Sequence, residues 1–373
     1  MTQIAWLDRC RAAKPIRSAL TPVSNDAPET KLTASTNESR SAPSSNGPAM
    51  LPIVDGPPHQ SNGSECRLPT FSDEQSQPLN LQLRSALCQT QRMGHECFDI
   101  EISDKVGHIK MNRPKKANSM IASFWNDLPA IVDEMSASGS VRAIVLSAEG
   151  KHFCSGMDLS VFQSDPTLSD SDGPKHPSRR GERFRSTALK LQDSFTALER
   201  ARMPVLCAIQ GACVGGAIDM VSAADLRYAS ESAYFSIAEI NIGMTADVGT
   251  LQRMPRLVAE GIVRELAYTG RRWSADEALA AGFVNRVFAD QDALLSGVHE
   301  VAAEIASKSP MAVLGTKKSL QYSQEHSIAD GLEYIANWNA SMFDTDDMAE
   351  AFTAELEQRP ADFPDLWPVS RGL

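Results

Sequence analysis

The chain has too few cysteines, and too little positive charge, for several classes of protein. Its 373 residues contain 7 cysteines, an odd number, and no two of them form a Cys-x-x-Cys pair. This pattern provides no disulfide framework, so we expect a reducing compartment. Acidic residues outnumber basic ones by 47 to 36, which gives a net charge of -11. A protein that binds nucleic acid through a basic face needs the opposite balance, so nucleic acid is not an expected partner.

The sequence also lacks a long uninterrupted hydrophobic run. The most apolar window, VLCAIQGACVGGAIDMVSAA over residues 205–224, contains Gln210, Asp219 and several glycines. An ionisable group near the middle of such a segment is costly in lipid, so we expect no membrane span. The start of the chain has no long apolar core and is not a secretory signal. No histidine or cysteine cluster has metal-ligand spacing, so no metal is expected either.

Composition divides the chain near residue 95. The first stretch is rich in Ser, Pro, Asn and Thr, and such a segment buries too little apolar surface to offset its ordering entropy. We therefore expect residues 1–95 to be a disordered tail, used for targeting or tethering or serving only as a spacer. Strand and helix patterns alternate over residues 96–290, which predicts an α/β core. Helical patterns dominate residues 291–373, which predicts a C-terminal helical region.

Local patterns indicate the main elements of the core. Apolar patterns predict a hairpin over residues 98–111 and buried strands over residues 141–147 and 204–209. A helical pattern begins at Met120, and Pro129 inside it should kink the helix or mark a late start. The polar segment over residues 164–184 predicts a long loop, which is either a tolerated insertion or a flap beside a substrate pocket.

Two glycine-containing segments follow predicted strands, GKHFCSGMDL over residues 150–159 and IQGACVGGAIDM over residues 209–220. Small residues at such junctions let a ligand approach the main chain closely. The glycine pair in the second segment opens a helix, where free amide hydrogens point outward with the positive end of the helix dipole. One amide from each turn can hold a developing enolate oxygen. Close packing of the helix is the structural alternative. A phosphate-binding loop is a further possibility, but this sequence lacks the lysine of GxxxxGK[ST].

Three acidic residues lie near these turns in segments that otherwise read as buried. Glu239 and Asp247 belong to FSIAEINIGMTADVGTLQRMP, and Asp219 lies in the first turn of the glycine helix. Each has a structural alternative. Asp219 can be a helix-start acid, Glu239 a surface residue at a strand end, and Asp247 an N-cap for the helix VGTLQRM.

The motifs together resemble the enoyl-CoA hydratase/isomerase (crotonase) superfamily. The resemblance rests on MNRPKKANS, FCSGMDL, GACVGGAIDMVSAADLRYAS and TGRRWSADEALAAGFVNRVF, and it spans about residues 97–357. The segment with the two acids, ELAYTG and NWNASMFDT are similar to one branch, the Δ3,5-Δ2,4-dienoyl-CoA isomerases. The resemblance implies a spiral of ββα units. It also implies C-terminal helices that build a trimer, commonly paired into a hexamer.

The resemblance also implies where the substrate is held. The backbone donors of the oxyanion hole correspond to Met157 and Gly216, and the preceding glycines, Gly156 and Gly215, lie against the substrate. The family often has a third glycine in the second motif, where this chain has Ala217. That position follows the donor, so we expect the oxyanion hole to survive.

The reaction implied for this branch moves a proton from C2 to C6 of a 3,5-dienoyl thioester, in unsaturated fatty acid β-oxidation. We assign Glu239 to C2, Asp247 to C6 and a supporting role to Asp219. Burial raises the pKa of such carboxyls, which suits a base that later returns its proton. An enoyl-CoA hydratase, which usually relies on two glutamates, and a non-catalytic scaffold are the alternatives. Cys154 beside the first turn is read as a small packing residue.

The expected partners follow from the same resemblance. The substrate is an acyl-CoA thioester, and coenzyme A is part of it, so no separate cofactor is expected. The chain ends in VSRGL, which is not a peroxisomal address of the S-K-L type. Its arginine-containing start favours the mitochondrion, with the peroxisome as the alternative.

Overall fold

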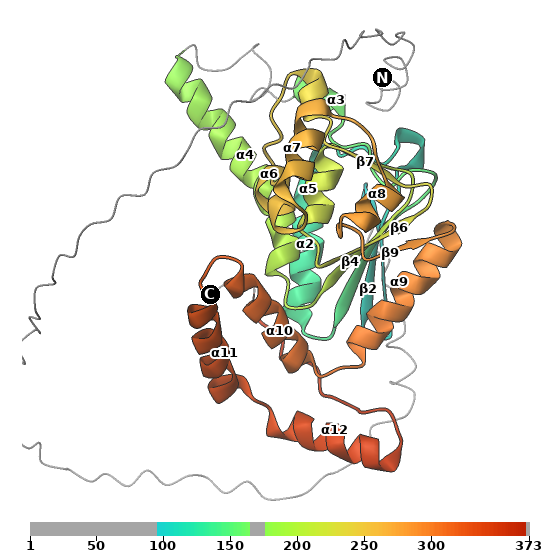
Figure 1. The fold of residues 1–373 in the computed structure, drawn as a ribbon, viewed down its shortest axis with the longest axis vertical. Helices are drawn as coiled ribbons and strands as arrows, with labels where there is room; N and C mark the ends of the chain where they lie inside the picture. Colours follow the sequence, from blue (N-terminus) through green and yellow to red (C-terminus); the bar gives the residue numbers. More distant parts are fainter. Residues whose placement is uncertain (1–94, 165–175, 371–373) are drawn as a thin grey trace, which may run out of the picture. The chain divides into compact units, whose positions relative to one another are not determined.

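The computed structural model describes residues 95–164 and 176–370 (Figure 1). Residues 1–94 of the expected tail and residues 165–175 of the expected loop lie outside the described residues. Within the described ranges, strands interleave with helices up to residue 288 and only helices follow. The mixed α/β class and the helical C-terminal region predicted from the sequence are confirmed.

The larger sheet of the described residues has the strand order β1-β2-β3-β4-β6-β9. Its strands are β1 (Phe98–Ser103), β2 (Val106–Met111), β3 (Ala143–Ala148), β4 (Val205–Ile209), β6 (Leu226–Ser230) and β9 (Arg286–Phe288). The first two strands form the expected antiparallel hairpin, in which Phe98 pairs with Met111. The other neighbours are parallel, and parallel neighbours require crossover segments between them.

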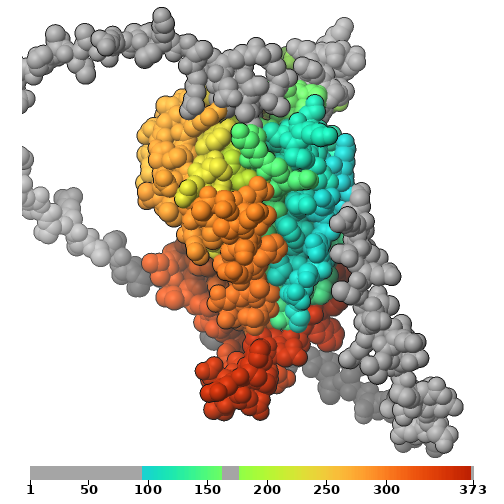
Figure 2. All heavy atoms as spheres, turned by 90° about the vertical axis from the view of Figure 1, so that its right-hand side faces the viewer, coloured from blue at the N-terminus to red at the C-terminus, as the bar shows by residue number. Residues whose placement is uncertain are grey.

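Helices cover both faces of this sheet. They are α2 (Ala122–Ser138), α4 (Pro177–Arg200) and α9 (Gln291–Ala306). Because successive strand residues point to opposite faces, Ile144 and Leu146 of β3 belong to the hydrophobic cluster that includes residues of α2 and α4. Ala143 and Val145 belong to the cluster that α9 covers. Figure 2 shows α9 in orange on its face of the molecule.

A smaller sheet, in the order β5-β7-β8, carries the segments of interest. Its strands are β5 (Ala212–Val214), β7 (Tyr234–Ser236) and β8 (Trp273–Ser274). β5 and β7 are parallel, so their carboxyl ends lie at the same edge of the sheet. Gly215 and Gly216 follow β5 and Glu239 comes soon after β7. This pairing brings the second glycine turn and the first acid of the 235–255 segment to one place.

The structure decides two points about helix boundaries. α2 already begins at Ala122 and contains Pro129, so of the two alternatives for this proline the late start is wrong and the kink stays a prediction. Residues 177–184, expected in a loop, form the first turns of α4. Pro177 occupies the start of this helix, where a missing N–H costs no helical hydrogen bond. Arg179, Arg180 and Glu182 after it are exposed, so this part of the helix is solvated.

The helices that follow α9 are α10 (Pro310–Ser323), α11 (Ile328–Met342) and α12 (Thr345–Glu357). Buried Lys317 fixes α10, because its Nζ donates to the carbonyls of Leu198 and Met203 and to Asp225. No helix in the described ranges is long and apolar enough to span a membrane.

Candidate active site

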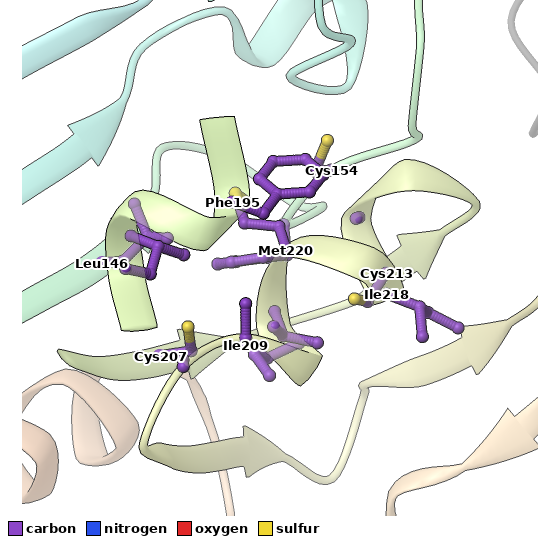
Figure 3. Packing of buried hydrophobic residues seen from close by; sticks show 14 of the residues in the cluster. Leu146, Cys154, Phe195, Cys207, Ile209, Cys213, Ile218 and Met220 are labelled. Atoms are coloured by element: carbon purple, nitrogen blue, oxygen red, sulfur yellow. The ribbon is translucent and has the colours of Figure 1, made fainter. Parts of the chain in front are cut away.

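Backbone pairing holds the two predicted glycine turns side by side. The Cys154 amide donates to the carbonyl of Ala212 at 2.9 Å, and the Val214 amide donates to the carbonyl of Cys154 at 3.1 Å. These bonds form a parallel bridge between Cys154 and Cys213 of β5. Figure 3 shows both cysteine side chains inside the apolar core. The first glycine turn is therefore attached to the strand that leads into the second.

The amides expected to form the oxyanion hole border one small space. Gly156 and Gly215 have positive φ angles of 83° and 59°, which residues other than glycine rarely adopt. Each is followed by an expected donor, Met157 or Gly216. Neither amide hydrogen-bonds to another described residue. A Cβ built on Gly216 would lie 4.0 Å from the Met157 nitrogen. The structure brings the four predicted residues together, and the oxyanion role stays a prediction.

A third segment fixes the far side of the first turn. The Met120 amide donates to the carbonyl of Gly156, and the Asp158 amide donates to the carbonyl of Met120, both at 2.9 Å. In this parallel bridge Met120 forms hydrogen bonds with Gly156 and Asp158, the residues on either side of Met157. The Met157 amide is therefore left for the opposite side, where Gly216 lies.

Asp219 is fully enclosed and has a fixed partner. It belongs to the first turn of α5 (Gly216–Ser222), and only 1% of its surface is exposed. Its Oδ1 accepts a hydrogen bond of 2.6 Å from the amide of Thr250, the first residue of α6 (Thr250–Arg253). Burial raises the pKa of Asp219 to about 6, although the bonds from Thr250 oppose this. Asp219 thus connects α5 to the segment that carries Asp247.

Glu239 has one side-chain oxygen without a partner. It opens a short 3-10 helix, η3 (Glu239–Ile242), just after β7. Its Oε2 is buried and has no hydrogen-bond partner, so the alternative of an exposed strand-end residue is wrong. Burial, and then the charge of Asp219, raises the pKa of Glu239 to about 8. A carboxyl with a buried, unpaired oxygen and a pKa of this kind is poised to take up or give a proton near neutral pH.

Asp247 lies in the loop between η3 and α6. The N-cap of α6 is Gly249 and not Asp247, and the side chain that accepts from the first amide of the helix is that of Asp219. The alternative in which Asp247 is an N-cap is therefore wrong. Burial raises the pKa of Asp247 above its usual value.

The three carboxyls influence one another's ionisation. The charge of Asp219 raises the pKa of Glu239, and the charge of Asp247 raises the pKa of both others. Like charges at this range cannot all form in a buried site. The cluster therefore keeps a proton near neutral pH and can offer one acid and one base at the same time.

The Asp247 loop is held by two side chains that no sequence pattern singled out. Gln192 of α4 donates from Nε2 to the carbonyl of Asp247 at 2.7 Å. Arg253 of α6 donates to the carbonyl of Val248 at 3.2 Å. No motif indicates either residue, because each acts on the main chain of a segment that only the fold brings near.

Neither a cysteine nucleophile nor a metal ion is supported at this site. Cys154 is fully buried, and burial raises the pKa of its thiol to about 12. Its Sγ contacts the carbonyl of Asn118 at 3.1 Å, so it is a packing residue, as the sequence indicates, and not a thiolate nucleophile. In the part of the chain that the structure describes, no group of three or more His, Cys, Asp or Glu side chains could hold a metal ion.

Comparisons with known proteins agree with this geometry. A model of the enoyl-CoA hydratase/isomerase family matches residues 101–366. The mitochondrial Delta(3,5)-Delta(2,4)-dienoyl-CoA isomerase of Mus musculus is 42% identical over 71% of this chain and 81% of its own. The peroxisomal Delta(3,5)-Delta(2,4)-dienoyl-CoA isomerase of Arabidopsis thaliana is 41% identical over 70% of this chain and 93% of its own.

Solved structures agree as well. The crystal structure of enoyl-CoA hydratase from Bacillus anthracis matches with a TM-score of 0.65 and 28% identity, covering 72% of this chain and 99% of that one. The crotonase-like fold expected from the motifs is thereby confirmed.

Gly216→Ala tests whether the space between the two amides is used. The added Cβ would lie at ordinary contact distances, 3.4 Å from Met120 Sδ and 3.7 Å from Trp125 Cη2, so the fold should tolerate it. The same Cβ would occupy the space beside the Met157 amide. We expect kcat on an acyl-CoA thioester to fall by roughly 100-fold, as when one oxyanion donor is lost, with an unchanged thermal unfolding midpoint.

The matched control is Gly261→Ala in α7 (Glu260–Thr269), where a Cβ meets nothing within 4 Å. This variant should keep both activity and stability. Full activity of Gly216→Ala would show that the space beside the amides does not hold the thioester oxygen.

Proposed function

Because the chain belongs to the enoyl-CoA hydratase/isomerase family, whose members act on acyl-CoA thioesters, we propose that it isomerises 3,5-dienoyl-CoA to 2,4-dienoyl-CoA. The observation that carries this proposal is the meeting of two kinds of group. Glu239, which has one buried oxygen, and the partly buried Asp247 both have raised pKa values. They lie on the segment after β7, which is bonded to the turn that carries the Gly216 amide. The relatives from mouse and Arabidopsis that bear this activity in their names support it.

In the proposed mechanism, the thioester oxygen accepts hydrogen bonds from the amides of Met157 and Gly216. Glu239 removes a proton from C2, and the electron pair of the broken C–H bond delocalises over the dienolate and its oxygen. Asp247 then donates a proton to C6, and the double bonds come to rest at C2 and C4. One proton leaves carbon and one arrives, so the dienoyl chain is neither oxidised nor reduced. The role of Glu239 at C2 and that of Asp247 at C6 are our assignments.

The reactive form of this pair carries one proton. The pKa of about 8 assigns that proton to Glu239 in the ligand-free protein at neutral pH. Isomerisation from the 3,5 to the 2,4 isomer requires it on Asp247 instead, and the reverse reaction requires it on Glu239. The two carboxyls therefore titrate as a unit, and activity reports on the pair rather than on either residue alone.

Hydration is a weaker candidate because of the partner of Asp219. A hydratase uses two carboxylates that flank a water, and Asp219 would have to be the second. Its Oδ1 instead accepts the hydrogen bond from Thr250. A scaffold without activity is weaker still, since burying the unpaired Oε2 of Glu239 costs stability and would give nothing in return.

No separate cofactor is part of the proposal, since the reaction transfers only a proton and coenzyme A belongs to the substrate. We propose the mitochondrion as the compartment, as in the name of the mouse relative. The peroxisome, named for the Arabidopsis relative, is the alternative.

We also propose that the chain assembles as a homotrimer or a homohexamer through its C-terminal helices. Ile328 and Leu332 of α11 are 84% and 64% exposed, and Phe352 and Leu356 of α12 are 64% and 86% exposed. Large exposed apolar patches usually mark an interface, and homo-oligomers are usually closed rings. By contrast, Leu294 and Val298 of α9 are buried against the chain's own sheet.

The direct test is an assay of the purified protein with 3,5-dienoyl-CoA and 2-enoyl-CoA side by side. We expect isomerisation of the first and little hydration of the second. Asp247→Asn should nearly abolish isomerisation because an amide of the same size cannot supply the proton, while circular dichroism stays unchanged. If hydration of 2-enoyl-CoA dominates, the protein is a hydratase and not an isomerase. If neither substrate is turned over, the result favours the non-catalytic scaffold.

The pH dependence of isomerisation tests the coupling between the acids. We expect kcat/KM to fall as the pH rises through about 8, because the pair then loses its only proton. Asp219→Asn removes a negative charge that raises the pKa of Glu239, so the alkaline limb should move to lower pH. The asparagine oxygen can still accept the Thr250 bond.

Asp292→Asn on the exposed start of α9 is the control for this pH profile and should leave the limb in place. A limb that stays put or moves to higher pH in Asp219→Asn would contradict the coupling.

Sedimentation equilibrium tests the assembly. We expect a trimer or hexamer at micromolar concentration, and Leu356→Asp should shift it toward the monomer because the charge enters an apolar interface. Ile102→Asp changes an apolar residue of β1 that is 54% exposed and serves as the control. A wild-type protein that sediments as a stable monomer would contradict the proposal.

A further inference from the structure

The backbone around Asp247 is held by side chains and not by secondary structure. Gln192 Nε2 donates to the carbonyl of Asp247 at 2.7 Å, and Arg253 Nη1 donates to the next carbonyl, that of Val248, at 3.2 Å. Asp247 itself precedes the helix α6 and makes no cap for it. The position of its carboxyl therefore depends on these two donors and on whatever fixes them.

Both donors are fixed by α4. Gln192 is part of that helix, and Arg253 is bound to it by a two-pronged ion pair. Arg253 Nε and Nη2 donate to the two oxygens of Glu199 at 2.8 and 2.9 Å, and Nη2 also donates to Thr196 Oγ1 at 3.1 Å. Such bidentate pairs hold the guanidinium plane in one orientation. The Arg253 side chain is 15% exposed, so solvent screens the pair only in part.

The loop has a glycine where this arrangement needs one. Gly249 has a φ of 132°, and a Cβ there would lie 1.7 Å from Arg253 Nη1. The absence of a side chain lets the guanidinium lie against the loop and reach the Val248 carbonyl. The local sequence DVG and the arginine four residues after the glycine thus act as one unit.

We propose that Gln192, Arg253 and Glu199, here called the Asp247 clamp, are positioning residues that keep the Asp247 carboxyl in reach of C6 of the substrate. The proposal rests on the proposed function. Neither of the two bonds to the loop goes to a side-chain oxygen of Asp247. The clamp acts through two successive carbonyls, those of Asp247 and Val248, and leaves the carboxyl of Asp247 free to exchange a proton.

The clamp serves one end of the reaction only. Glu239 begins η3, and its carbonyl accepts a hydrogen bond from the Met244 amide at 3.0 Å, so its main chain is held by local bonds and receives none from the clamp. Loosening the clamp should therefore slow proton delivery at C6 while proton removal at C2 continues. A salt bridge of purely structural value would not separate these two steps.

The test uses two conservative variants, Gln192→Met and Arg253→Lys. The first keeps the length of the side chain but removes the donor, and the second keeps the charge but removes the two-pronged geometry. Two controls change the same residue types elsewhere. Gln291→Met removes a bond to the carbonyl of Ala148, and Arg271→Lys breaks pairs with Glu265 and Glu277.

The kinetic measurement is made in D2O with 3,5-dienoyl-CoA. Deuterium at C2 of recovered substrate reports proton removal, and 2,4-dienoyl-CoA reports the completed reaction. For both clamp variants we expect kcat for isomerisation to fall by roughly 10- to 100-fold, the effect of misplacing a reacting group by about 1 Å. Exchange at C2 and KM should stay near their wild-type values, and the controls should match wild type in everything.

An equal loss of exchange and isomerisation, or no loss of isomerisation, would overturn the clamp. A second measurement does not need turnover, namely hydrogen–deuterium exchange of the backbone amides of residues 244–256. We expect faster exchange there in the clamp variants only, and unchanged exchange would also overturn the proposal. If wild type does not isomerise the substrate but the amide exchange still rises, the proposed function fails and the clamp remains as a structural unit.

Discussion

The whole site depends on one backbone pairing, the parallel bridge between Cys154 and Cys213. It attaches the first glycine turn to β5, and β5 leads directly into the second turn. Because β5 also pairs in parallel with β7, the chain that leaves β7 reaches the same edge with Glu239. Two free amides and a buried carboxyl thus meet without any side-chain contact that could vary. This explains why both cysteines are enclosed in the core, where small side chains let the strands pack closely.

Features encoded in short stretches could be predicted from the sequence. The hairpin of β1 and β2 and the glycine pair that opens α5 both depend on neighbours a few residues away. The glycine turns were predictable for the same reason, because positive φ angles at Gly156 and Gly215 are a local requirement. The roles of the acids came from a resemblance and not from the pattern.

What the sequence could not supply are contacts between distant segments. Thr250 lies 31 residues after its partner Asp219, and Gln192 lies 55 residues before the carbonyl that it binds. Polar side chains in a helical stripe read as solvated, so nothing distinguishes Gln192 from its exposed neighbours. The start of α4 at Pro177 was missed because a proline and a run of charges are typical of loops as well as of a first helical turn. Only the fold decides between them.

The three carboxyls differ in what holds them, and this difference separates their roles. Asp219 accepts a backbone hydrogen bond, which favours its anion and makes it suited to a lasting negative charge. Glu239 has an oxygen with no partner, so neither its charged nor its neutral form is favoured by a fixed donor there. Asp247 is held through its main chain, which fixes its position without fixing its proton. A proton transfer between two carbons needs the last two properties at its ends, and a fixed charge beside them keeps one proton in the pair at neutral pH.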